Sequence, residues 1–228
     1  MALLSDIWLK PMRESIRRLN DVMGHSVNLQ TANPASQHSV EDDVDANSTM
    51  ARNFMHDTPV LEPYILKALR ISSKLPDPKA NVDDWVKDNK HLFWNVTSYT
   101  LEKKLDTIPF DQCFIGTRPS AVEDVIRYFL NAANDVSKDE WNLKAIQAVF
   151  EDTIKGVSFR SRTTGEMTRA GGSILLRWAL LGGDHGPALI PIMELLGKKA
   201  TMRRLNLGLD VAREQHESLA ARVEKLHG

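Results

Sequence analysis

The sequence predicts an all-α fold, an irregular helical bundle with a polar, acidic linker and a long C-terminal helix. Beyond residue 57, apolar residues recur in most segments with the 3.6-residue period of a helix. Two helix-start signals, Thr58-Pro59 and Pro119-Ser120, stand in front of such segments. No segment shows the alternation of apolar and polar residues that is typical of a strand. The chain has 228 residues, 42% of them hydrophobic, so it can bury a substantial core.

Residues 1–24 are expected to form an amphipathic N-terminal helix that packs on the rest of the chain. Basic residues stand among apolar ones there, a pattern similar to that of an organelle transit helix. Three acidic residues, Asp6, Glu14 and Asp21, count against a transit peptide, because such peptides are poor in acids. The packed helix is therefore the favoured interpretation.

Residues 25–57 are expected to be a flexible, disordered linker. They are rich in Ser, Asn, Gln, Asp and His, and their acidic run includes Glu41, Asp42, Asp43 and Asp45. Such a composition buries too little apolar surface to offset the entropy of ordering. The acidic run either is simply solvated, which is the favoured interpretation, or holds a basic surface closed.

Residues 58–112 are expected to be a helical connecting subdomain. Its first helix follows Thr58-Pro59 and stops before a turn at Leu75-Pro76-Asp77-Pro78. A second helix is predicted over residues 83–93. Phe93 and Trp94 at its end are assigned to the core in preference to a base-stacking platform.

Residues 113–228 are expected to form a second helical domain. A helix follows Pro119-Ser120, with Ser120 and Glu123 at capping-box spacing, and another covers residues 138–155. Residues 155–172 resemble a loop, and residues 171–204 hold two apolar helices separated by a short polar loop.

The final segment, residues 199–226, is predicted to be one long helix with an apolar seam. The seam positions alternate by three and four: Met202, Leu205, Leu209, Ala212, His216, Leu219, Val223 and Leu226. Gly208 costs about 1 kcal/mol relative to alanine, and Ala212 and His216 fill a seam poorly. We therefore favour packing within the chain over the first half of this helix, with a partner helix as the alternative.

The basic residues are concentrated in one stretch. The formal net charge of the chain is −1, whereas residues 155–204 hold nine basic and three acidic residues, a local charge of +6. Such a cluster is what a nearly neutral protein needs to bind phosphates, because lysine and arginine contacts release condensed counterions. A solvated basic face is the alternative.

Other function classes are disfavoured by composition. The seven histidines have no HxxxH spacing and Cys113 has no second cysteine, so neither a metal site nor an internal disulfide is expected. No apolar run approaches the ~20 residues that cross a bilayer, so no membrane partner is expected. Asp184-His185 places an acid beside an imidazole, but no nucleophile motif accompanies it, and we assign no catalytic residues.

Four short motifs occur in order within the basic stretch. They are Arg177-Trp178-Ala179-Leu180-Leu181-Gly182, Gly186-Pro187-Ala188-Leu189, Leu195-Leu196-Gly197-Lys198 and Arg203-Arg204-Leu205. Their order and spacing resemble the C-terminal anticodon-binding domain of bacterial and mitochondrial-type glutamyl-tRNA synthetases. Residues 64–93 resemble more loosely the helical region between the catalytic and anticodon-binding parts of that family, so the likeness covers about residues 60–210. Leu181 stands where that family usually has threonine, and Gly186 where some members have a threonine that helps to read a base.

The resemblance implies a helical cage that receives anticodon bases of a tRNA with a glutamate-type anticodon. Unstacked bases are read through their edges and faces, and a guanidinium offers planar donors suited to either a base edge or a phosphate. The implied tRNA-binding residues are the cage positions Arg177, Gly186, Pro187 and Leu189 and the basic residues Arg160, Arg162, Arg169, Lys198, Lys199, Arg203 and Arg204.

The resemblance also limits the expected activity. Neither a HIGH-type motif nor a KLSKR-like loop is found, so no cofactor is expected in this chain, and ATP only if a catalytic domain exists elsewhere. The chain is thus expected to be the tRNA-binding portion of a glutamate-tRNA ligase of protein biosynthesis, mitochondrial or otherwise cytoplasmic. The alternative is a noncatalytic interaction protein derived from that domain, which assembles through its terminal helices.

Overall fold

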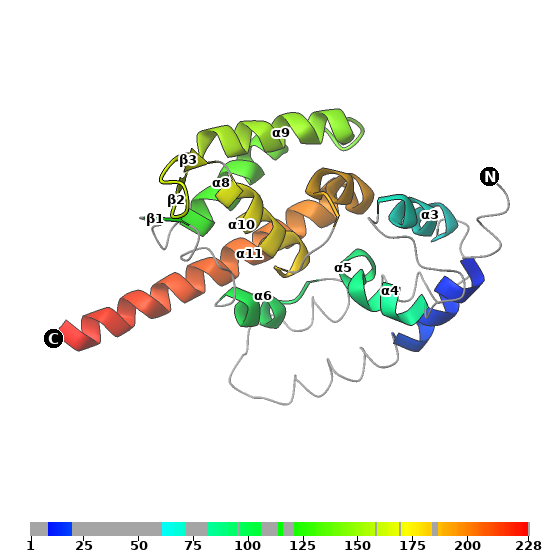
Figure 1. The fold of residues 1–228 in the computed structure, drawn as a ribbon, viewed down its shortest axis with the longest axis horizontal. Helices are drawn as coiled ribbons and strands as arrows, with labels where there is room; N and C mark the ends of the chain where they lie inside the picture. The colour runs from blue at the N-terminus through cyan, green and yellow to red at the C-terminus, as the bar shows by residue number, and fades with distance from the viewer. Residues whose placement is uncertain are drawn as a thin grey trace. The chain divides into compact units, whose positions relative to one another are not determined.

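The computed structural model confirms the all-α class (Figure 1). It describes residues 9–19, 61–71, 82–94, 96–105, 114–115, 121–157, 159–168, 170–183 and 187–227. The predicted linker, both helix-start signals and the turn at residues 75–78 lie outside these residues. The chain divides into two compact units, residues 1–95 and 96–228, which are described separately. The domain limits expected from the sequence stay predictions.

The first unit holds a helix over residues 9–19 and the helices α3 (Leu61–Ile71), α4 (Val82–Asp88) and α5 (Lys90–Phe93). In the first helix Leu9, Met12 and Ile16 are buried, three and four residues apart, which confirms its amphipathic character over these residues. Arg18 Nη2 donates to Asp83 Oδ1 of α4 at 2.7 Å. The nearby Ser15 hydroxyl and the Arg18 guanidinium lower the pKa of the Asp83 carboxyl, so the carboxylate connects the two helices at neutral pH.

The single helix predicted over residues 83–93 is in fact two helices, interrupted at Asn89. Asn89 has φ −108° and ψ 23°, outside the α-helical region, and its Nδ2 donates to the Trp85 carbonyl at 2.9 Å. Phe93 is 1% exposed and meets Tyr64 and Trp85 edge-on, which confirms its place in the core.

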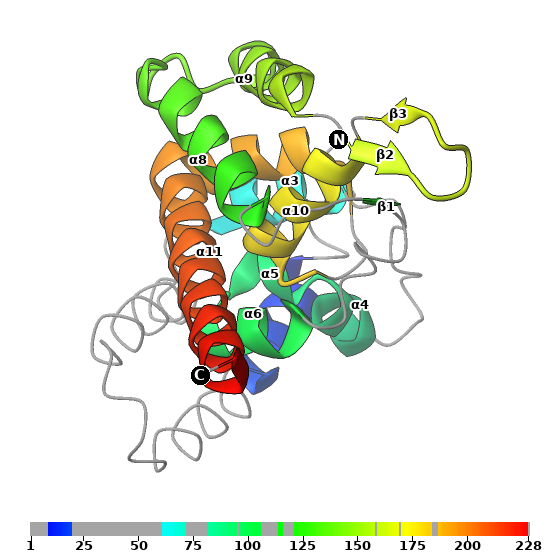
Figure 2. The same cartoon turned by 90° about the vertical axis from the view of Figure 1, so that its left-hand side faces the viewer.

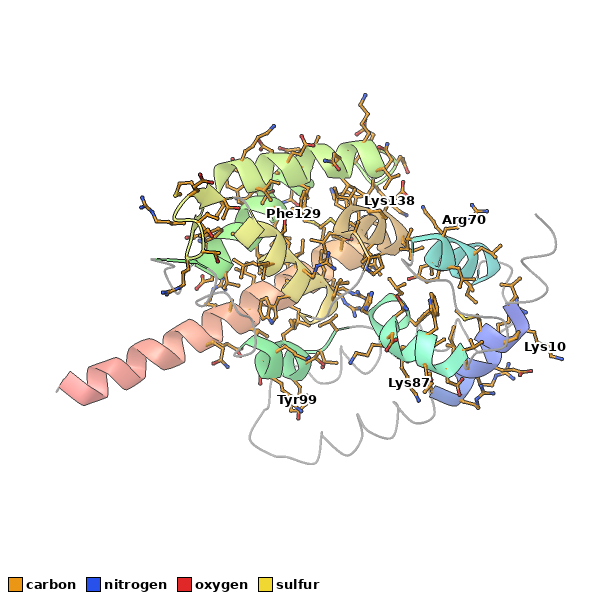
Figure 3. All side chains as sticks on the ribbon, viewed as in Figure 1. Lys10, Arg70, Lys87, Tyr99, Phe129 and Lys138 are labelled. Carbon is orange, nitrogen blue, oxygen red and sulfur yellow. The ribbon has the colours of Figure 1, made fainter. Side chains whose placement is uncertain are left out.

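The second unit is built around its long C-terminal helix. Its helices are α6 (Ser98–Leu105), α8 (Ala121–Asn134), α9 (Leu143–Gly156), α10 (Ala170–Leu181) and α11 (Leu189–His227). Figures 1 and 2 show α6, α8 and α10 packed against α11, with α9 on the outer side of α8. Phe129 of α8, labelled in Figure 3, is fully buried in this core.

Helix α6 was not predicted, although its start follows a recognisable signal. Thr97 precedes it, and the Thr97 Oγ1 accepts a hydrogen bond from the Thr100 backbone N–H at 3.3 Å, as an N-cap residue does. Leu101, fully buried, then anchors the helix to the core.

Helix α9 begins five residues later than the periodicity suggested. Asn142 caps it, since its Oδ1 accepts from the backbone N–H groups of Lys144 and Ala145, each at 3.1 Å. The preceding residues form a turn in which Ser137 Oγ accepts from Glu140 N. Trp141 lies at the end of this turn and is still buried in the core, where its Nε1 donates to the Met193 carbonyl at 3.0 Å.

A small three-stranded antiparallel sheet replaces much of the loop expected over residues 155–172. Its order is β1 (Phe114–Ile115), β2 (Phe159–Ser161) and β3 (Met167–Thr168), with Ile115 opposite Arg160 and Arg160 opposite Met167. Strands of two or three residues are too short to show alternation in a sequence, so the loop expectation was wrong here.

Helix α11 contains both the second apolar helix and the final helix expected from the sequence. The two parts meet at Gly197, whose φ of 78° and ψ of 164° are open essentially to glycine alone. Leu205, Leu209 and Ala212 are buried, which confirms packing within the chain over the first half of the seam. No helix among the described segments is both long and apolar enough to cross a membrane.

Candidate nucleic-acid interface

The N-terminal end of α10 holds the β2–β3 hairpin. A Cβ built on Gly171 would lie 2.3 Å from Cδ2 of Phe159, so the Phe159 ring lies directly against the helix backbone. Phe159 itself is 7% exposed. The absence of a side chain at residue 171 therefore allows the hairpin to be attached closely to α10.

Along the rest of α10 almost every side chain faces the core. Trp178 is fully buried, and its Nε1 donates to the Leu101 carbonyl of α6 at 3.1 Å. Leu175, Leu176, Ala179 and Leu180 are also fully buried. Within residues 171–181, only Ser173, Ile174 and Arg177 are partly exposed, at positions that share one face of the helix. A ligand of α10 must approach this narrow strip.

Arg177 connects this strip to the start of α11. Its Nη1 donates to the Pro187 carbonyl at 3.0 Å, and its side chain is half-buried. Burial lowers the pKa of the Arg177 guanidinium, because a low dielectric disfavours its charged form. A guanidinium nevertheless remains protonated in proteins, so Arg177 places a positive charge beside the loop between α10 and α11.

Side chains on either side of the kink in α11 bind the end of α8 and the start of α9. Glu194 Oε1 accepts from the Leu143 backbone N–H at 3.1 Å, at the N-terminus of α9. Lys198 Nζ donates to the Asn134 carbonyl at 3.2 Å and to the Val136 carbonyl, at the C-terminus of α8. An acid and a base are thus placed where each complements the helix dipole it meets.

Comparison with known proteins decides the family. Residues 91–209, slightly more than half of the chain, match the family model described as an anticodon binding domain. The chain belongs to the anticodon-binding domain family. The glutamate-tRNA ligase 1 of Fervidobacterium nodosum is 27% identical over 93 residues, 40% of this chain and 18% of that protein. The chain thus matches less than a fifth of the length of that relative, and the predicted resemblance to the anticodon-binding portion of glutamyl-tRNA synthetases is confirmed.

The anticodon-binding domain does not gather the predicted residues into one cluster. Arg160 and Arg162 are exposed on the hairpin, and Lys199 and Arg203 are exposed one turn apart on α11. Figures 1 and 2 show the hairpin well apart from the part of α11 that follows Gly197. Arg169 and Gly186 lie outside the described residues.

Four of the predicted positions have structural roles in the fold. Arg204 is 2% exposed, and its Nη1 donates to the Leu180 carbonyl at 3.0 Å. The expectation that Arg204 lies on a basic rim is corrected, because a side chain buried under α10 cannot reach a phosphate. Leu189 is 6% exposed and Pro187 is buried, so both pack inward, while Lys198 contacts the end of α8.

The structure adds a pair of lysines that the charge count over residues 155–204 omitted. In α6, Lys103 and Lys104 follow one another, and Lys104 Cβ lies 3.7 Å from the position that a Cβ would take on Gly183. Lys103 Nζ lies 6.0 Å from the ring centroid of Tyr99, which is 50% exposed. The Lys-Lys pair was the available signal, but only the fold brings Lys104 to the turn that ends α10.

Proposed function

We propose that this chain is the tRNA-binding portion of a glutamate-tRNA ligase and that it binds a tRNA with a glutamate-type anticodon. The observation that carries the proposal is the match of residues 91–209 to the anticodon-binding domain. The glutamate-tRNA ligase 1 relative supports the identity of the tRNA. On this proposal the residues of the chain supply binding, and the chemical step of the ligase belongs to a catalytic domain elsewhere.

The exposed charges support RNA as the ligand. Within residues 155–204, Arg160, Arg162, Lys199 and Arg203 are exposed, and Arg177 lies half-buried beside the loop that precedes α11. Arginine provides planar donors for a base edge or a phosphate, and lysine provides a point charge for phosphates. Unpaired anticodon bases are the part of a tRNA whose edges the donors of Arg177 can read.

Arg177→Ala is expected to weaken binding of a glutamate-anticodon tRNA by about 1–3 kcal/mol, the usual contribution of one specific arginine contact. Filter binding or fluorescence anisotropy at fixed salt measures the Kd. Lys144→Ala is the matched control, because Lys144 is exposed on α9 and outside the predicted site, and its Kd should equal that of the wild type. Equal binding by Arg177→Ala, or none by the wild type, contradicts the proposal.

A second candidate function is favoured by the length of α11. The helix continues to His227, and in Figure 1 its C-terminal part extends past the other helices of this unit. The seam positions expected from the sequence, Leu219 and Val223 among them, lie in this part. A noncatalytic interaction protein would use that seam to join a partner helix.

Leu219→Glu distinguishes assembly through the seam from tRNA binding, because a charge in an apolar seam disrupts the packing of one helix on another. If the wild-type chain forms an oligomer through the seam, sedimentation velocity should show that Leu219→Glu loses this oligomer. Ala221→Glu, about 180° around the helix from the seam positions, should leave the oligomer unchanged. A monomeric wild type, or equal sedimentation of both variants and the wild type, would exclude self-assembly through this seam.

A further inference from the structure

The β2–β3 hairpin has one face in the core and the other exposed. Successive side chains of a strand point to opposite faces, so Phe159 and Arg160 lie on different faces. Phe159 packs against Gly171, whereas Arg160 is exposed. Met167, the cross-strand neighbour of Arg160, is 59% exposed. The hairpin is therefore fixed to α10 through Phe159 and presents an exposed outer face.

The exposed groups of the hairpin suit an anionic partner. Arg160 and Arg162 carry positive charge, Thr163 and Thr164 place exposed hydroxyls in the turn, and Glu166 is the one acid among residues 159–168. Arginine, threonine and backbone N–H groups are the usual donors to phosphate oxygens. Met167 is the one large apolar side chain that is exposed within these residues, too little for an apolar protein partner.

The hairpin is separated from the strip that carries Arg177. Gly171, which holds the hairpin, and Arg177 are six residues apart on α10, a rise of about 9 Å. That distance is the axial rise of about three nucleotides in one strand of a duplex. Figures 1 and 2 show the hairpin leaving the bundle at the N-terminal end of α10, while Pro187, the partner of Arg177, follows the C-terminal end.

We propose that the β2–β3 hairpin binds the phosphate backbone of the tRNA stem next to the anticodon loop, as a contact separate from the one near Arg177. The inference rests on the proposed function and adds a second site to it. Because side chains cannot read the deep, narrow major groove of an RNA helix, this contact positions the tRNA and reads no base. The exposed hairpin thus contributes affinity and register, and discrimination among anticodons arises elsewhere.

The double variant Arg160→Gln/Arg162→Gln tests the inference in the full chain. Its Kd for a tRNA transcript with a glutamate anticodon is measured between 50 and 200 mM salt. Each phosphate contact contributes about 0.7–0.9 to the slope of log Kd against log salt, so the rise in Kd across this range should shrink about tenfold. The ratio of Kd values for a glutamate anticodon and an altered anticodon should stay unchanged, since no base contact is lost.

Two further variants keep the test independent of folding. Glu166→Gln removes the acid of the hairpin and should tighten binding, the opposite direction to the arginine variant, and improved binding cannot come from unfolding. Thr163→Glu adds a negative charge at the exposed turn and should weaken binding. A linear oligonucleotide with the anticodon-loop sequence should bind the wild type and the double variant equally, because it has no stem.

The outcomes separate the two proposals. If the wild type binds the tRNA and the double variant shows the same salt slope, the hairpin contact is overturned and the proposed function stands. A changed discrimination ratio in the double variant would overturn the claim that the hairpin reads no base. Absence of tRNA binding by the wild type overturns the proposed function, and the hairpin contact with it.

Discussion

Trp178→Ala is expected to lower the free energy of unfolding by about 3–5 kcal/mol, the cost of truncating a buried aromatic side chain to a cavity. Trp178 is fully buried and extends from α10 to α6, where its Nε1 donates to the Leu101 carbonyl. The variant loses the packing of the indole and the hydrogen bond between the two helices together. Urea denaturation followed by circular dichroism measures the change, and the melting temperature should fall by roughly 10 °C.

Trp178→Phe separates the two contributions. A phenyl ring keeps much of the buried surface but has no N–H donor, so this variant should cost about 1–3 kcal/mol, less than alanine. The adjacent Arg177→Ala variant is the second comparison, because Arg177 is half-buried and its expected effect is on tRNA binding. Wild-type stability in Trp178→Ala would show that α6 and α10 do not pack as the structure places them.

Gly208→Val is expected to cost about 3 kcal/mol, at the upper end of what overpacking a core usually costs. A Cβ on Gly208 would lie 2.7 Å from Cβ of Ala179 and 3.3 Å from its Cα, and 3.5 Å from Cδ1 of Ile126. The backbone of α11 therefore crosses α10 at very short range, and any side chain forces the helices apart. Helix propensity alone predicts the opposite sign for alanine at this position, a gain of about 1 kcal/mol.

An exchange of the small residues provides the control for this contact. Ala179→Gly removes the methyl group that a Cβ on residue 208 would meet, so Gly208→Ala should be tolerated better in that background. A double-mutant cycle should give a favourable coupling free energy of about 1–2 kcal/mol. Additive effects of Gly208→Ala and Ala179→Gly would mean that the two residues do not touch.

The role of Gly208 in the fold differs from the one that the sequence suggests. In the sequence it is a weak position in the predicted C-terminal helix, because glycine is a poor helix former. In the fold it is a point at which α10 and α11 approach each other closely. Close contacts between helices depend on which residues face each other across the interface, and the spacing of apolar residues along one helix carries no information about its neighbour.

The candidate site, too, could be predicted from the sequence only in part. The motif order around Arg177 was sufficient to predict the anticodon-binding resemblance, which residues 91–209 confirm. The burial of Arg204 and Leu189 could not be predicted from the sequence. The residue type alone does not show whether a helical position faces the core, because that depends on the elements that pack against the helix. The hairpin could not be predicted for another reason, since its strands are too short to show a periodicity in the sequence. They are stabilised by pairing with each other and with β1 and by the packing of Phe159 on Gly171.

By itself, the sequence determined that this protein is all-α, where most of its helices lie, and which family its basic segment resembles. These properties are local, since periodicity and short motifs are written in consecutive residues. The tertiary structure alone decided which charges reach the surface. Arg160, Arg162, Lys199 and Arg203 are exposed, Arg204 is buried under α10, and Arg177 lies beside Pro187. Exposure depends on contacts between residues far apart in the chain, and only packing establishes those contacts.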